Sequence, residues 1–322
     1  MRKYALLCCA LAVIMITVPL ISVRYMRVEG GGENISSESD LPRDTIDVMM
    51  SNTGSVKTLK MREYVIGSLS GEISASYHKE ALKAQAVACY TFALYVASRE
   101  EKRPEGADIS DDSTVYQSYI DEDARKKKWG DDYEKNEKIM SEAVDEVFGQ
   151  YLEYDGKPAM AAYHAMCSGK TESAANVWGK SVSYLKSTVS SGDKLAPNYE
   201  TCQKVSADEF KRILFKKGLT YGDYPTDASK WIGDIERYDS GVVKYVDICG
   251  KKISGTDMRS LFSLKSADFD ISFADGGFTF TCRGNGHFVG MSQYGADYMA
   301  RQGSSYDEIL NHYYPGTVLK KL

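Results

Sequence analysis

The stretch that decides the fold runs from His78 to Ser98 and reads HKEALKAQAVACYTFALYVAS. Alanine, leucine and lysine favour helix, and neither glycine nor proline interrupts the stretch. Its apolar residues are so dense that they cannot all lie on one narrow stripe, and a helix that is apolar on most sides is buried. We therefore predict a central, largely buried helix here.

Periodic patterns on both sides of this stretch predict the remaining elements. Further helices are expected at 58–70, 132–148, 207–217, 257–264 and 296–301. A hairpin is expected at 151–164 around the turn Asp155-Gly156, and antiparallel strands at 235–238, 242–249, 270–273 and 277–282. Helices first, followed by mixed strands and helices, are typical of an α+β fold, either as one globule or as two lobes flanking a substrate cleft.

The amino end carries a different pattern. After Arg2 and Lys3, residues 4–23 are uncharged and almost wholly apolar. Such a run rises about 30 Å as a helix, enough to cross a bilayer, whereas the apolar core of a signal peptide is usually about 7–15 residues long and ends in a small-residue cleavage site. We predict a single-pass membrane anchor at 1–25, a Gly- and Ser-rich linker at 26–44, and an extracytoplasmic domain at 45–322.

Composition narrows the class of protein. The chain has 322 residues with 40 Lys plus Arg against 45 Asp plus Glu, a formal charge of −5, and 43% hydrophobic residues. This is the composition of a folded protein, and its acidic balance argues against nucleic acid as a partner. Five cysteines follow the apolar run, an odd number that does not indicate a disulfide scaffold.

Three segments could carry chemistry. Gly71-Glu72-Ile73 places a carboxyl group among apolar helices, where burial raises its pKa toward that of a general acid, although an exposed helix end is the plainer interpretation. In the segment 163–172, His164 and Cys167 could hold a zinc ion, form a nucleophile pair or be structural. The glycine-rich segment 284–296 predicts a tight turn close to a ligand or another strand, and it contains neither a Gly-x-Ser-x-Gly elbow nor a phosphate-binding loop.

Together, the three segments resemble the stage II sporulation protein D family, which includes amidase enhancers. The resemblance rests on SGEISASYHKEALKAQAVA from Ser70, YHAMCSGKTE from Tyr163 and GHFVGMSQYGA from Gly286, and it extends from about Lys57 to the carboxyl end. It implies a lytic transglycosylase that cleaves peptidoglycan strands already stripped of stem peptides, between N-acetylmuramic acid and N-acetylglucosamine. Such an enzyme uses one carboxyl group twice, as acid and then as base, and forms a 1,6-anhydro sugar.

The resemblance also implies roles for individual residues. Glu72 occupies the position of the catalytic glutamate. Substrate-binding positions are Gln117, Tyr119, Ser168, Gly169, Lys170 and Thr171, and His287, Ser292, Gln293 and Tyr294 line or support the cleft. Some relatives are similar in bearing a metal near the cleft. His164 and Cys167 are the favoured zinc ligands here, with Cys202, Cys282 and His287 as other candidates. The chain departs from the family at Tyr90, where members commonly have Arg, and at Phe288, where they have Gly; we expect Phe288 to form a bulkier cleft wall.

The resemblance implies a setting as well. We expect the domain to act in engulfment on the mother-cell side of the sporulation septum, with a peptidoglycan amidase and a polytopic membrane scaffold as partners. Two alternatives stay open: a non-catalytic glycan-binding enhancer of an amidase, and a hydrolase of wall peptides that uses Cys167 and His164.

Overall fold

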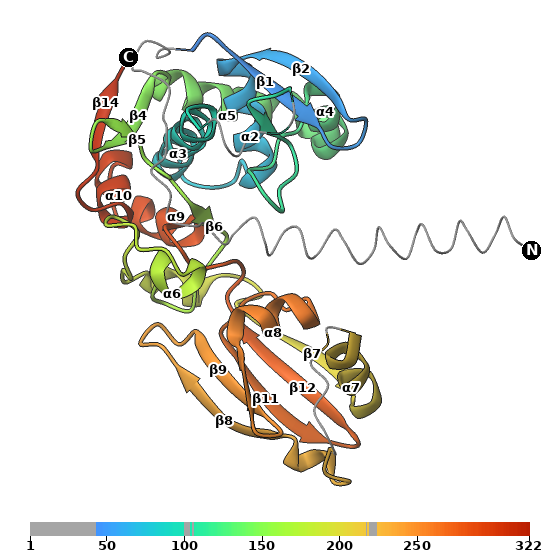
Figure 1. The fold of residues 1–322 in the computed structure, drawn as a ribbon. Coiled ribbons are helices and arrows are strands. Elements are labelled where there is room, and N and C mark those ends of the chain that lie inside the picture. Colours follow the sequence, from blue (N-terminus) through green and yellow to red (C-terminus); the bar gives the residue numbers. More distant parts are fainter. Residues whose placement is uncertain (1–42, 100–103, 105, 217, 219–223) are drawn as a thin grey trace, which may run out of the picture.

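The structure is a computed structural model that describes residues 43–322 except 100–103, 105, 217 and 219–223. The predicted anchor and all but the last two residues of the predicted linker lie outside these residues. Within the described ranges, no helix is long and apolar enough to span a membrane. Figure 1 shows a mixed α+β molecule with a largely helical lobe and a second lobe rich in strands.

The first lobe is built around the helix predicted at its centre. Helix α3 (Lys79–Ala97) is buried along most of its length and is surrounded by helices from both ends of the chain. These are α2 (Met61–Glu72), α5 (Tyr133–Val147), α9 (Gln293–Arg301) and α10 (Tyr306–Tyr313). Burial of alanine and leucine against four helices therefore confirms the central helix.

Small sheets and short helices border this helical core. Strands β1 (Thr45–Met50), β2 (Ser55–Lys60) and β3 (Ile109–Ser110) form one sheet, and β4 (Gln150–Tyr154), β5 (Lys157–Pro158) and β14 (Val318–Lys321) form another. Strand β6 (Tyr163–His164) pairs in parallel with β13 (Met291–Ser292). The shorter helices are α4 (Glu122–Trp129), α6 (Ala174–Trp178) and the 3₁₀ turns η3 (Gly130–Asp132) and η4 (Ser191–Leu195).

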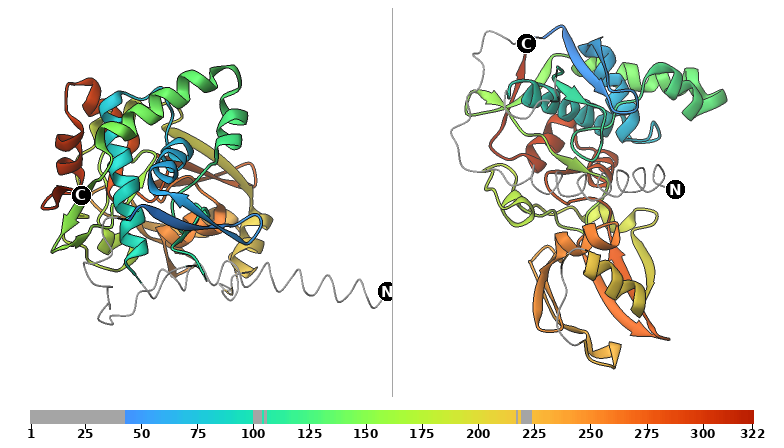
Figure 2. Two further views of the ribbon diagram at one scale, coloured as in Figure 1. Left: turned by 90° about the horizontal axis from the view of Figure 1, so that it is seen from above. Right: turned by 45° about the vertical axis from the view of Figure 1, so that its right-hand side comes forward.

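The second lobe consists of two antiparallel three-stranded sheets with two helices (Figure 2). One sheet has the order β11 (Phe269–Ala274), β12 (Gly277–Arg283), β7 (Glu200–Ser206); the other has β10 (Lys251–Ser254), β9 (Val243–Ile248), β8 (Ile232–Arg237). Helices α7 (Ala207–Lys216) and α8 (Gly255–Phe262) and the 3₁₀ turn η5 (Ala228–Lys230) complete it. Phe210 of α7 stacks on Phe262 and contacts Phe278, so an aromatic core of its own holds this lobe together.

The chain enters and leaves the second lobe at neighbouring points. Strands β7 and β12 pair along their whole length, from Ser206 opposite Gly277 to Glu200 opposite Arg283. A third apolar cluster joins the lobes, made of Cys167, Val242, Ala267 and Phe288. Phe288 is only 1% exposed, which corrects the expectation that it forms a cleft wall. Its φ of 67° keeps a backbone conformation that favours glycine, the residue that members of the resembled family have there.

Candidate functional site

The candidate catalytic carboxyl group lies at the end of α2, where two glycines let another segment approach. A Cβ atom at Gly67 would lie 2.3 Å from the ring of Tyr119, and one at Gly71 would lie 2.6 Å from Ser118 Oγ. Gly67 and Gly71 are four residues apart and so share one face of the helix. Their lack of side chains lets the segment 117–120 lie against α2, and the backbone N–H of Ser118 donates to Glu72 Oε1.

This environment perturbs the acidity of Glu72. Burial raises the pKa of Glu72 above its usual range, because the charged form loses its hydration. The Ser118 N–H, the Tyr163 hydroxyl and the charge of Lys128 act in the opposite direction. Among the residues that the structure describes, no second carboxylate contributes to this shift. The arrangement is that of a single carboxyl group whose raised pKa suits it to give up one proton and later to accept another.

A buried hydrogen-bond network fixes Tyr163 beside Glu72. The Tyr163 hydroxyl donates to Gln117 Oε1 at 3.1 Å, while Gln117 Nε2 donates to Tyr64 Oη at 2.9 Å and to the carbonyl of Cys89 at 3.1 Å. Gln117 is 2% exposed and its amide is fully engaged within the protein. The structure thus gives Gln117 a supporting place instead of the predicted sugar contact. Tyr119 stacks on Tyr64 at 5.5 Å.

Lys128 is a component of the site that the sequence analysis missed. It lies on α4, which was not predicted, and its Nζ donates to the carbonyl of Ser70 at 2.7 Å. Ser70 is in the last turn of α2, whose carbonyl groups lack helical partners. Lys128 therefore satisfies the end of the helix that carries Glu72 and places a positive charge near the carboxyl group. The run Lys126–Lys128 was the only sequence signal, and such runs usually face solvent.

His164 of β6 and His287 lie next to each other. Their ring centroids are 5.7 Å apart, and His287 lies 5.2 Å from the ring of Trp178. His287 Nδ1 accepts from the N–H of Val289 at 3.0 Å, and burial lowers the pKa of His287 to about 4. His164 Nδ1 faces the carbonyl of Val289 at 3.3 Å, while its buried Nε2 has no hydrogen-bond partner within the described part of the chain. Both rings are neutral at physiological pH.

Cys167 and His164 have different partners. The Cys167 thiol lies 2.7 Å from Asp193 Oδ2, and burial holds its pKa well above the usual range. A thiol in this state is not an activated nucleophile, which disfavours the hydrolase alternative. No group of three or more His, Cys, Asp or Glu side chains in the described ranges could hold a metal ion. Zinc at His164 and Cys167 stays a prediction.

Several other predicted substrate-binding residues are buried supports. Thr171 and Ser292 have no exposed surface, and Gln293 is 5% exposed. Thr171 Oγ1 accepts from the N–H of Thr188 at 2.8 Å, and Ser292 Oγ donates to Asp193 Oδ1 at 2.5 Å and caps α9. Like Gln117, Thr171 holds its neighbours in place and does not line the site. Tyr294 is half-buried with its ring against Tyr77.

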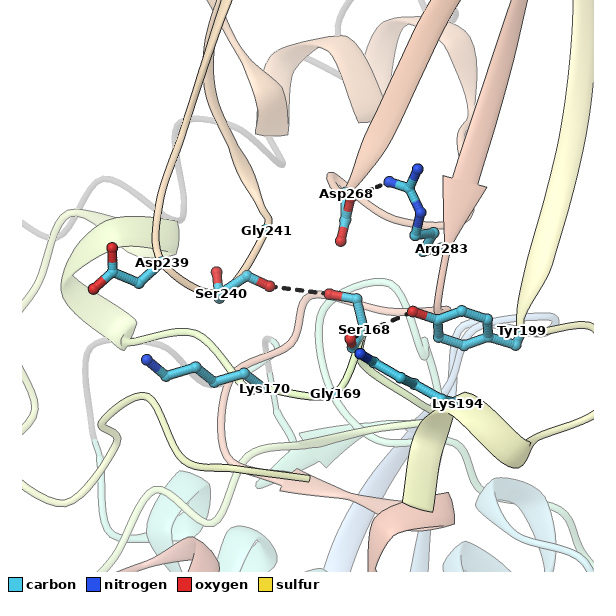
Figure 3. A pocket seen from close by; sticks show the side chains of 10 residues that line it. All are labelled: Ser168, Gly169, Lys170, Lys194, Tyr199, Asp239, Ser240, Gly241, Asp268 and Arg283. Carbon is cyan, nitrogen blue, oxygen red and sulfur yellow. Dashed lines mark hydrogen bonds and ion pairs between the residues drawn. The ribbon is translucent and has the colours of Figure 1, made fainter. Parts of the chain in front are cut away.

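Ser168, Gly169 and Lys170 do line a pocket, at the junction of the two lobes (Figure 3). The pocket has a volume of about 550 Å³, and its other walls are Lys194, Tyr199, Asp239, Ser240, Gly241, Asp268 and Arg283. Ser168 Oγ donates to the carbonyl of Ser240 at 3.1 Å, which connects the loop of the first lobe to the turn between β8 and β9. The sequence predicted one side of this pocket but not the side that the second lobe supplies.

The fold and the site together define a two-lobed α+β protein with one desolvated glutamic acid at a helix end. A family model described as "Stage II sporulation protein" matches residues 50–154. The chain is 35% identical to stage II sporulation protein D of Bacillus amyloliquefaciens and 33% identical to that of Bacillus subtilis, over 98% and 100% of its length and 95% and 96% of theirs. It is 27% identical to the amidase enhancer of Bacillus subtilis, over 79% of its own length and 40% of that protein. The chain belongs to the stage II sporulation protein D family, a family of sporulation proteins.

Proposed function

We propose that this chain is a lytic transglycosylase that cleaves denuded peptidoglycan strands between N-acetylmuramic acid and N-acetylglucosamine during spore engulfment. The observation that carries the proposal is the state of Glu72. It is half-buried, it has a raised pKa to which no second carboxylate of the described residues contributes, and it accepts a hydrogen bond from the Ser118 N–H. Glycosidases that use water or a covalent intermediate need two carboxyl groups. A reaction with an internal nucleophile needs one.

The proposed reaction uses the Glu72 carboxyl group twice, for two different protons. Protonated Glu72 donates its proton to the glycosidic oxygen, and the bond from that oxygen to C1 of the muramic sugar breaks. The Glu72 carboxylate then accepts the proton of the C6 hydroxyl of the same sugar, and the bond from O6 to C1 forms. The Ser118 N–H donates to the carboxylate between these steps, while burial favours return to the acid.

The proposed setting rests on the family and on the sequence. Residues 1–25 hold the domain at the cell membrane on the mother-cell side of the sporulation septum, beside a peptidoglycan amidase and a polytopic membrane scaffold. The support for this setting is membership of a sporulation family and the apolar run 4–23. Zinc at His164 and Cys167 is no part of the proposed reaction.

A second candidate function is that of a non-catalytic enhancer, which binds glycan and stimulates an amidase. The identity to an amidase enhancer favours it. Against it stands the desolvation of Glu72, since burying a carboxyl group without a task only costs stability.

The test is to incubate the full-length protein with denuded glycan strands and to identify the products by mass spectrometry. We expect new 1,6-anhydro-muramic ends with the wild type and none with Glu72→Gln. Glu63→Gln is the matched control, because Glu63 is exposed on the same helix. Amidase stimulation without new ends from the wild type would support the enhancer, and full activity in Glu72→Gln would refute the proposed mechanism.

A further inference from the structure

We propose that the pocket between the lobes binds the free lactyl carboxylate of a muramic acid residue, and that Lys170 and Lys194 thereby select glycan without stem peptides. The inference rests on the proposed function in one respect only, that the ligand is glycan. It assigns substrate selection to residues from two separate segments of the first lobe, across a junction that the second lobe completes (Figure 3).

The charges of the pocket are not balanced. Arg283 is engaged with Asp268 at 3.1 Å and with Asp270, and Arg237 also lies 3.4 Å from Asp268. By contrast, neither Lys170 nor Lys194 has a hydrogen bond or ion pair from its ammonium group among the described residues. The two positive charges of these ammonium groups outnumber the one remaining negative charge, that of Asp239. The pocket therefore offers a net positive charge to a ligand.

The backbone keeps these groups accessible to a ligand. Gly169 has a φ of 105°, and a Cβ atom there would lie 2.7 Å from Lys194 Cε, so the Lys194 stem lies across this glycine. Gly241, on the opposite wall, has a φ of 95°, and a Cβ atom there would lie 2.7 Å from Asp268 Oδ2. Side chains at either position would fill the pocket or displace its charges.

The other walls suit a sugar. Ser168, Ser240 and Tyr199 contribute hydroxyl groups, and none of the described residues that line the pocket is a valine, leucine, isoleucine or methionine. Hydroxyl and acetamido groups of a glycan can exchange hydrogen bonds with such walls, while a carboxylate forms the stronger, charge-assisted bonds with lysine. An ordinary apolar ligand would find no comparable surface here.

The pocket lies within reach of a strand bound at Glu72. Ser168 follows Tyr163, the partner of Glu72, by five residues, so their Cα atoms are at most about 17 Å apart. One glycan strand can therefore contact both places. When a stem peptide is attached, the lactyl carboxyl group is part of an amide bond. It then has no charge for the lysines and carries a chain that the pocket must exclude, so only peptide-free muramic acid satisfies it.

Binding measurements on three ligands test the inference. The Glu72→Gln variant is used because it leaves the ligand intact. We compare its affinities for three ligands: denuded glycan, the same glycan with its carboxyl groups converted to methylamides, and chitin oligosaccharides. We expect denuded glycan to bind about fivefold to tenfold more tightly than its methylamide, as one charge-assisted contact would produce. Adding Lys170→Gln and Lys194→Gln should abolish that difference and leave chitin binding unchanged.

The outcomes separate this inference from the proposed function. Lys204→Gln with Lys180→Gln is the control pair, since both lysines lie outside the pocket. The inference is overturned if the Glu72→Gln protein does not prefer denuded glycan to its methylamide, or if that preference persists after Lys170→Gln and Lys194→Gln are added. Either result counts against it even if the wild-type protein makes anhydro ends. A preference that the pocket variants abolish supports the inference even if no ends are made.

Discussion

At the scale of single residues, Glu72 is held in a state that opposes folding. Its carboxyl group is desolvated, and the Ser118 N–H, the Tyr163 hydroxyl and Lys128 offset that cost only in part, since the net effect is a raised pKa. A carboxyl group whose folded-state pKa exceeds its unfolded value makes the protein less stable as the pH rises through that interval. Acid–base function and stability therefore conflict at this position.

The conflict gives a first prediction. Glu72→Gln should raise the melting temperature at pH 7–8 by about 2 °C, which corresponds to roughly 1 kcal/mol in a protein of this size, because the amide avoids burying a charge. The gain should vanish below the ordinary pKa of glutamic acid, where the wild-type side chain is protonated in both states. Thermal unfolding at several pH values measures it, with Glu63→Gln as control. Equal melting temperatures at every pH would contradict the assigned burial.

Lys128 gives a second prediction. Its charge lowers the pKa of Glu72, so Lys128→Met should raise that pKa. The first step requires protonated Glu72, and the limb of the pH–rate profile on which activity falls with rising pH should move to higher pH. Lys128→Arg should restore the limb. A uniform loss of activity at all pH values, with no movement of the limb, would show that Lys128 acts only on the end of α2.

The sequence revealed some of these residues and not others. Glu72 could be found because the segment around it matches the family. Tyr163 stands beside His164 in a recognised segment, but only the fold brings it to Glu72 across the buried Gln117. Ser118 acts through its backbone N–H, which every residue except proline carries, so no residue pattern marks it.

At the scale of elements, the two glycines of α2 make the site possible. Glycine lowers helix stability, so two of them on one helical face need a reason. Here the reason is the close approach of the segment 117–120, with the N–H of Ile120 donating to the carbonyl of Gly67 at 3.3 Å. The approach presents a backbone donor to Glu72.

Substitution at Gly71 tests that view. Alanine is the better helix former, so Gly71→Ala in an exposed helix would stabilise it. In this structure the new Cβ atom would lie 2.6 Å from Ser118 Oγ, and we expect the segment to shift and activity to fall by at least about tenfold, the order expected when a catalytic group loses its position. The backbone amide resonance of Ser118 in an NMR spectrum should shift as well. Glu63→Ala on the same helix serves as the control, and unchanged activity in Gly71→Ala would refute the role.

Elements with a strong pattern of their own were predictable, and those formed by distant contacts were not. Helices α3, α5, α7 and α8 lie close to their predicted ranges. The helix predicted at 58–70 instead begins at Met61, because residues 55–60 pair with β1. The highly charged α4 has no apolar stripe to reveal it, and its place depends on an ion pair between Arg125 and Glu137.

At the scale of the whole molecule, the two lobes are joined by a small contact that includes one strained residue. Phe288 lies with Cys167, Val242 and Ala267, and the Ser240 hydroxyl donates across the junction to Glu172 Oε2. A phenylalanine at a φ of 67° is costly by roughly 1–2 kcal/mol. Burial of the ring outweighs that cost.

This balance predicts an unusual order of stabilities. Phe288→Ala should lower the free energy of unfolding by about 3–5 kcal/mol, the usual loss for a buried phenylalanine. Phe288→Gly should be more stable than Phe288→Ala by about 1 kcal/mol, because glycine adopts the positive φ without strain. Denaturant unfolding of the three proteins measures the order. If the Phe288→Ala protein were more stable than the Phe288→Gly protein, the positive φ assigned to residue 288 would be wrong.

The pairing of Glu200 with Arg283 has a consequence for how such a protein can change. Opposite residues on antiparallel strands have Cα atoms about 5 Å apart, so everything between them is a loop closed at its base. A lobe inserted in this way can be lengthened, exchanged or replaced by a short turn without altering the path of the helices that carry Glu72. The second lobe is thus the part of the molecule best placed to diverge, and residues 200–283 are the natural unit to exchange with a relative in a chimaera.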